Sequence, residues 1–79
     1  MKATVLVRPK SGILDPQGAA VETALEHLGF SVAGARVGKV VDLEVDATDP
    51  VEARAQVEQM CEQLLANPLM ESYEIELHG

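Results

Sequence analysis

The fold depends first on one stretch, residues 7–18, which has the sequence Val7-Arg8-Pro9-Lys10-Ser11-Gly12-Ile13-Leu14-Asp15-Pro16-Gln17-Gly18. It joins the first predicted strand to the first predicted helix, a connection that usually needs about 2–6 residues. Asp15 can accept hydrogen bonds from the free amides of the first helical turn, and Pro16 gives up an N–H that has no partner there. The helix is therefore expected to begin at Pro16. Two cations, Arg8 and Lys10, lie close to its start, which suggests an anion or partner site and not a catalytic motif.

Length and composition predict one small acidic domain, residues 1–79. A chain of 79 residues has room for a single core, to which only two aromatic residues, Phe30 and Tyr73, can contribute. We therefore expect a homo-oligomer, a homodimer or a dimer of dimers. The net charge of −7 argues against nucleic acid as a partner, because such binding needs many Lys and Arg contacts to phosphate. No apolar run approaches the length of a membrane span, and no hydrophobic leader precedes the first strand, so a cytoplasmic location is expected.

Hydrophobic periodicity predicts six elements in the order βαββαβ. Alternating or β-branched residues favour strands, and apolar residues at helical spacing favour helices. Asp49-Pro50-Val51-Glu52 carries the start signal of the second helix, an N-cap with a proline at the first position and a glutamate at the third. The predicted strands are 2–8, 31–37, 40–46 and 72–78, and the predicted helices are 16–28 and 50–66.

The order βαββαβ is typical of an α+β, ferredoxin-like fold. We expect a four-stranded antiparallel sheet with two helices on one face, and a turn at Gly38-Lys39 between the second and third strands. The other face of the sheet would be open, and a second copy of the chain could cover it.

This topology places three loops at one end of the domain: residues 8–15, the turn at 36–39 and the turn at 65–68. Four of the six basic residues lie in two of these segments, namely Arg8, Lys10, Arg36 and Lys39. An acidic protein is thus expected to have one basic end. Lysines and arginines in loops often serve only solubility, but three segments shaped by Pro and Gly at one end favour a site for a phosphate or a protein partner.

The sequence contains no recognisable catalytic or metal-binding arrangement. His27 and His78 are far apart and have no evident acid partner, so both are expected to be structural or solvated. Cys61 is the only cysteine and falls on the apolar stripe of the second helix, formed by Val57, Met60, Cys61, Leu64 and Leu65. A buried thiol behaves as a small hydrophobe. The glycines form neither a P-loop nor a dinucleotide-binding motif.

Three segments, in this order, resemble one known family. They are residues 7–18, the run Arg36-Val37-Gly38-Lys39, and Met60-Cys61 followed by Leu64-Leu65-Ala66-Asn67-Pro68-Leu69-Met70-Glu71-Ser72-Tyr73. On these residues the chain is similar to the PurS family, the small subunits of phosphoribosylformylglycinamidine (FGAM) synthase. The likeness extends over nearly the whole chain.

The resemblance implies a role in the fourth step of de novo purine synthesis, a ligase reaction that consumes ATP and glutamine. A glutaminase subunit would release ammonia, and a large synthetase subunit would use ATP and Mg²⁺ to activate formylglycinamide ribonucleotide. This chain would be a non-catalytic adaptor between the two subunits and would bind no cofactor itself. We expect the larger subunits to dock on Arg8, Lys10, Asp15, Gln17, Gly18, Arg36, Gly38, Lys39, Asn67 and Pro68.

A second interpretation remains open from the residues alone. Ferredoxin-like modules of this size often bind small ligands, and a fold does not decide a function. The basic end would then bind a phosphorylated metabolite in a small regulatory domain. An independent enzyme is a weaker option, because acid, base and nucleophile candidates are missing.

Overall fold

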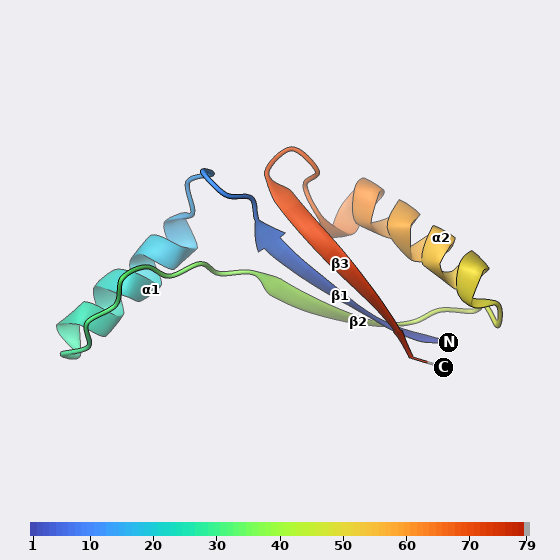
Figure 1. Ribbon diagram of the computed structural model, residues 1–79, viewed down its shortest axis with the longest axis horizontal. Coiled ribbons are helices and arrows are strands. Elements are labelled where there is room, and N and C mark those ends of the chain that lie inside the picture. Colours follow the sequence, from blue (N-terminus) through green and yellow to red (C-terminus); the bar gives the residue numbers. More distant parts are fainter. Residues whose placement is uncertain (79) are drawn as a thin grey trace.

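The computed structural model describes residues 1–78 as a long, thin molecule of 49 × 24 × 15 Å. A three-stranded sheet lies at its centre, with one helix against the sheet and the other helix held away from it (Figure 1). In chain order the elements are strand β1 (Lys2–Pro9), helix α1 (Pro16–His27), strand β2 (Lys39–Glu44), helix α2 (Pro50–Met60), the π-helical turn η1 (Cys61–Leu65) and strand β3 (Glu71–His78).

The sheet has the order β2-β1-β3, and both neighbouring pairs are antiparallel. β1 is the central strand, as its apolar residues predict, with Val5 opposite Val41 on one side and Ile75 on the other. Alternate residues of β1 are buried on the face that α2 covers. The described core contains only small or medium side chains: Ala3, Val5, Val7, Val45, Ala53, Val57, Cys61 and Ala66.

The expectation of a four-stranded sheet was wrong. Residues 31–37, predicted as a strand, belong to no sheet, and the predicted hairpin at Gly38-Lys39 is not formed. The chain instead runs straight through Gly38 into β2, so residues 30–38 extend beyond the sheet and not along its edge (Figure 1). A Cβ atom at Gly38 would collide with the carbonyl oxygen of Val7, so the backbones are in close approach at this point.

The two helices also do not share one face of the sheet. α2 packs against β3, but α1 lies alongside residues 30–38, well away from the strands (Figure 1). We call the unit formed by α1 and residues 28–38 the arm. Within α1 only Gly18 is buried, so the helix leaves most of its apolar side chains in solvent.

Both helix starts are where the sequence predicts them. Asp15 caps α1 through its side chain, which accepts from the Gly18 amide, and Asp49 caps α2 by accepting from the Val51 amide. Proline occupies the first helical position in both cases. An N-cap side chain and a proline at the first helical position act only on the first turn of the helix, so the sequence nearby is sufficient to predict where each helix begins.

The end of the second helix differs from the predicted apolar stripe. Ala53, Val57 and Cys61 are buried at a spacing of four residues, but the next buried residue, Ala66, follows Cys61 by five. The Ala66 amide donates to the Cys61 carbonyl at 3.0 Å and closes a π turn, which contains one residue more than an α turn. The extra residue in this turn rotates Leu64 into solvent, where it is 82% exposed. The expected burial of Cys61 is confirmed, and that of Leu64 was wrong.

Candidate functional site

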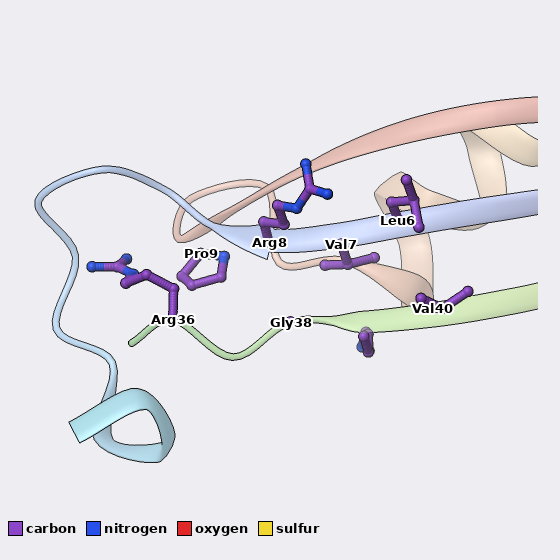
Figure 2. Close-up of a pocket in the computed structure, with 8 residues that line it drawn as sticks. Leu6, Val7, Arg8, Pro9, Arg36, Gly38 and Val40 are labelled. Carbon is purple, nitrogen blue, oxygen red and sulfur yellow. The ribbon is translucent and has the colours of Figure 1, made fainter. Parts of the chain in front are cut away.

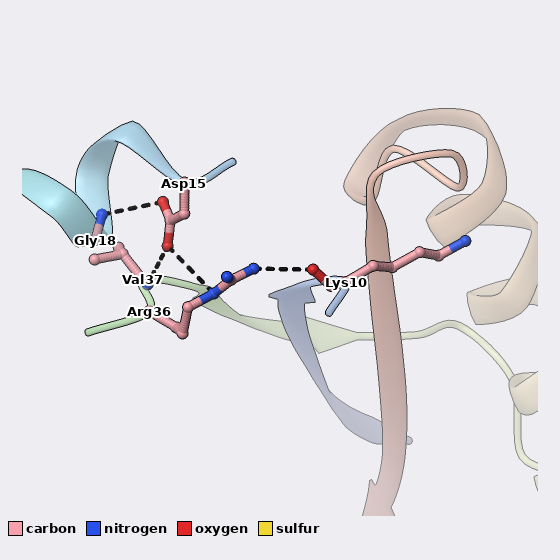
Figure 3. A network of polar contacts seen from close by, with 5 residues as sticks. All are labelled: Lys10, Asp15, Gly18, Arg36 and Val37. Carbon is pink, nitrogen blue, oxygen red and sulfur yellow. Dashed lines mark hydrogen bonds and ion pairs between the residues drawn. The ribbon is translucent and has the colours of Figure 1, made fainter. Parts of the chain in front are cut away.

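The carboxylate of Asp15 holds the base of the arm together. One oxygen accepts the Gly18 amide at 3.0 Å, and the other accepts the Val37 amide at 2.9 Å (Figure 3). The Arg36 guanidinium lies 3.8 Å from the second oxygen. The hydrogen bond from the Val37 amide is the main cause that lowers the pKa of Asp15, followed by the Gly18 bond, with a smaller contribution from Arg36. The Asp15 side chain is only 10% exposed, so it shapes the site and offers little surface to a partner.

Lys10 joins three segments of the basic end. Its ammonium donates to the Pro68 carbonyl at 2.7 Å, and its amide donates to the Met70 carbonyl at 2.9 Å. Its own carbonyl accepts from the Arg36 guanidinium at 2.9 Å (Figure 3). The three loops that the sequence places at one end are therefore connected by direct hydrogen bonds, even though one predicted strand is absent.

The turn after η1 has a capping arrangement of its own. The Asn67 amide donates to the Glu71 carboxylate at 2.7 Å, and the Asn67 side-chain oxygen accepts from the Leu69 amide at 3.1 Å. This is the local bonding for which asparagine is favoured in turns. Pro68 is held at the surface of this turn, where its carbonyl meets Lys10.

Two glycines permit close backbone contacts around the site. A Cβ atom at Gly18 would collide with the Ala35 carbonyl oxygen and the Asp15 carboxylate, so only glycine lets α1 approach residues 35–37 this closely. Gly38 has the same function beside Val7. Neither glycine presents a side chain to a partner, so both are determinants of shape.

The cations of the basic end do not converge on one point. Directly opposite residues in an antiparallel pair point to the same side, so Lys39, opposite Val7, lies on the side of α2. Arg8 lies on the open side with Leu6, and Arg36 reaches toward the loop after β1 (Figure 2). A shallow hollow of about 320 Å³ runs between them, lined by Leu6, Val7, Arg8, Pro9, Arg36, Gly38, Lys39 and Val40.

A second hollow of about 320 Å³ lies between the loop after β1 and the turn after η1. It brings together Asp15, Gln17 and Asn67, three of the predicted site residues. Two apolar residues of the loop, Ile13 and Leu14, also line it. The two hollows share Pro9 in their lining and contain seven of the ten predicted site residues, whereas Lys10, Gly18 and Pro68 line neither.

Sequence reasoning missed two groups that build this site. One is the backbone amide of Val37, which no side-chain pattern could reveal. The other is Glu71, which caps the Asn67 turn. A signal for Glu71 exists in hindsight, because an acidic residue four positions after an asparagine can accept from the turn amide.

Among residues 1–78 no cluster of three or more His, Cys, Asp or Glu side chains could hold a metal ion. His78 contacts the Thr4 hydroxyl at 3.0 Å on the open face, far along the strand from the basic end. Cys61 is fully buried, and burial, with Glu62 and Glu58 nearby, raises the pKa of its thiol.

Comparison with known proteins decides the family. Residues 2–79 match the family model described as PurS, phosphoribosylformylglycinamidine (FGAM) synthase. The chain belongs to the PurS family. It is 38% identical to the PurS subunit of Methanocaldococcus jannaschii, over 96% of this chain and 93% of the relative. It is 39% identical to the PurS subunit of Bacillus subtilis, over 96% of this chain and 90% of the relative.

Solved PurS structures have the same shape. The B. subtilis PurS structure matches with a TM-score of 0.88 at 38% identity, over 99% of this chain and 98% of that one. A chain of the structure of PurLQS from Thermotoga maritima matches with a TM-score of 0.83 at 38% identity, over 95% of this chain and 93% of that one. This similarity over nearly the full length shows that the chain has the same fold as these relatives.

The comparisons confirm the family and its place in FGAM synthase and purine biosynthesis, as the sequence resemblance implied. The chain is therefore a small subunit of this enzyme. Within residues 1–78 we find no helix with the length and apolar character needed to span a bilayer.

Proposed function

We propose that this chain is the non-catalytic adaptor of FGAM synthase. It would join the glutaminase and synthetase subunits, so that ammonia released from glutamine reaches the activated formylglycinamide ribonucleotide without loss to water. The observation that carries the proposal is the connected basic end, in which Lys10 and Asp15 tie three loops of a PurS-family chain into one shaped surface.

The residues of this surface have two different tasks. Asp15, Gly18 and Gly38 are used by internal contacts, and they set the shape of the loops. Arg8 and Lys39 are exposed, and they are free to meet acidic groups of a partner. The only ion pair of Arg8 among residues 1–78 is a 4.0 Å contact with Glu74, between two well-exposed side chains, and such pairs hold weakly.

The chain alone would bind neither ATP nor Mg²⁺. The described residues offer neither a metal cluster nor a phosphate loop, so both ligands belong in this proposal to the large subunit. A purine enzyme of this kind would work in the cytoplasm.

Reconstitution tests the adaptor role. The chain is mixed with the glutaminase and synthetase subunits of its host, and product formation is followed with glutamine or with ammonia as the nitrogen source. We expect glutamine-dependent turnover to require the chain and ammonia-dependent turnover to proceed without it. Equal glutamine-dependent turnover in its absence would refute the adaptor role.

Charge reversal tests the docking surface. Arg8→Glu with Lys39→Glu should weaken binding to the larger subunits by at least tenfold, because both side chains would then repel acidic partner groups. Arg36 is left unchanged because a glutamate there would face Asp15. The matched control is Lys2→Glu with Arg54→Glu, which changes the charge equally at exposed positions outside the two hollows.

The mass of each isolated variant is measured by light scattering, so that lost self-association is not mistaken for lost docking. Equal binding of both double variants to the larger subunits would contradict the docking surface. Saturable binding of inorganic phosphate or a purine nucleotide by the isolated chain would instead favour a ligand-binding domain.

A further inference from the structure

The second hollow, between the loop after β1 and the turn after η1, has mostly apolar walls. Its apolar lining residues are Pro9, Ile13, Leu14, Val37 and Met70. Leu14 is 84% exposed and Met70 is 48% exposed, so these walls are open to solvent in the chain alone. Large apolar side chains that gather at one place on a surface often mark a contact with another molecule.

Backbone hydrogen bonds hold both walls of this hollow in place. The Ile13 amide donates to the Lys10 carbonyl at 3.2 Å, and the Met70 amide donates to the Asn67 carbonyl at 3.0 Å. The Lys10 amide donates to the Met70 carbonyl at 2.9 Å and so joins the two walls. A partner would therefore meet a hollow that is already formed, and less conformational entropy would be lost on binding.

Two exposed carboxamides, those of Gln17 and Asn67, lie beside the apolar walls. Within residues 1–78 the Gln17 side chain forms no hydrogen bond, and the Asn67 side chain uses only its oxygen, which accepts from the Leu69 amide at 3.1 Å. A carboxamide can both donate to and accept from a peptide group. The free polar groups of the hollow therefore match the backbone of an extended peptide segment.

The charges of the hollow do not suit an anion. Its charged lining residues are two carboxylates, Asp15 and Glu71. Both are used internally, since Asp15 accepts from the Val37 amide and Glu71 accepts from the Asn67 amide. Pockets for small molecules usually have about 300–1,000 Å³ and enclose most of the ligand, whereas this hollow has about 320 Å³ and is open on one side. An uncharged side chain of a protein partner fits it better than a phosphorylated metabolite.

We propose that a peptide loop of a larger FGAM synthase subunit inserts an apolar side chain into this hollow. The inserted side chain contacts Ile13, Leu14 and Met70, and the peptide groups beside it bond to Gln17 and Asn67. The exposed cations of the docking surface do not line the hollow, so they steer the partner while the apolar contact holds it. This inference rests on the proposed docking of the chain to the larger subunits and adds an uncharged anchor to it.

Affinity for the larger subunits tests the anchor on the full chain. Leu14→Ser should raise the Kd for the mixed glutaminase and synthetase subunits by about tenfold or more, because it removes apolar contact without changing the charge. The matched control is Leu69→Ser, which has nearly the same exposure, 83%, but does not line the hollow. Its Kd should stay within about twofold of the wild-type value, because rim positions contribute little to binding.

Biolayer interferometry with the chain immobilised measures each Kd. Circular dichroism establishes that each variant is folded, and Leu14→Gln replaces Leu14→Ser if that variant is not. Equal Kd values for the wild type and the Leu14 variant would overturn the anchor and leave the adaptor role standing. If the Leu14 variant binds more weakly but glutamine-dependent turnover does not require the chain, the anchor is confirmed and the adaptor role fails.

Three further results would also overturn the anchor. One is the absence of saturable binding by the wild type, and another is equal weakening by Leu69→Ser. The third is a lower mass of the isolated Leu14 variant than of the wild type in light scattering, which would show that a second copy of the chain occupies the hollow.

Discussion

Asp15 shows how one residue can carry both a local and a long-range task. Its position before Pro16 predicts a helix cap, and it caps α1 through Gly18. Its second oxygen binds the Val37 amide, 22 residues away. Because both bonds favour the ionised carboxylate, the pKa of Asp15 is lowered.

Replacing Asp15 tests this linkage. The folded-state pKa lies below the unfolded value of about 3.9, so the stabilisation is present above that pH and is lost as the pH falls through the folded pKa. Asp15→Asn keeps one acceptor oxygen and loses the other, so at pH 7 it should melt several degrees below the wild type. As the pH is lowered through the folded-state pKa of Asp15, the gap should shrink, since the wild-type carboxyl then becomes neutral.

Thermal melts over a series of pH values from 7 downward make the comparison. Asp46→Asn is the control, because it removes the same charge at an exposed position. It should melt close to the wild type throughout the series. An Asp15→Asn deficit that does not change with pH would contradict the role of the charge.

At the scale of elements, local sequence signals set where α2 begins, and packing against the sheet sets which residues are buried at its end. Its start at Asp49-Pro50 follows the capping rules directly. Its end does not, because the π turn from Cys61 to Leu65 buries Ala66 and exposes Leu64. Packing against the sheet selects which residues are buried there, and the apolar stripe in the sequence cannot distinguish an α turn from a π turn.

Asp49→Ala should destabilise the fold by about 1 kcal/mol, the usual cost of removing an N-cap side chain. The lost bond is the one that its carboxylate accepts from the Val51 amide at 3.0 Å. Urea unfolding followed by circular dichroism measures the change. Thr48→Ala, the preceding exposed position, is the control and should change stability by less than about 0.5 kcal/mol. Equal effects of both substitutions would refute the cap.

At the scale of the whole molecule, the core is small for a chain that must fold. Its buried side chains are no larger than valine or cysteine, and ten large hydrophobic residues are exposed among those described. A second copy of the chain, as the composition already suggests, would supply further apolar contacts by covering some of these side chains.

The midpoint of thermal unfolding should therefore rise with protein concentration. Association that occurs only in the folded state stabilises that state by mass action. A tenfold increase in concentration should raise the midpoint of the wild type by a few degrees. Calorimetry over a concentration series measures this, and a wild-type midpoint independent of concentration would contradict self-association.

The loops that carry the predicted site meet as the sequence indicates, while their use as a docking surface stays a prediction. The sequence placed Arg8, Lys10, Arg36 and Lys39 at one end, and the hydrogen bonds through Lys10 confirm that their loops meet. The sequence could not separate residues that shape the surface, such as Asp15 and Gly18, from exposed ones such as Arg8. That distinction depends on backbone groups from distant segments, and no side-chain pattern encodes them.

By itself, the sequence determined where the two helices and three of the four predicted strands lie, and where both helices begin. These features depend on alternation, helical spacing, caps and prolines, which act over a few neighbouring residues. Only the tertiary structure decided that residues 31–37 leave the sheet. A tight turn and a straight passage at Gly38 have the same local pattern, so the choice between them depends on the strand, helix or second chain that covers the exposed apolar groups.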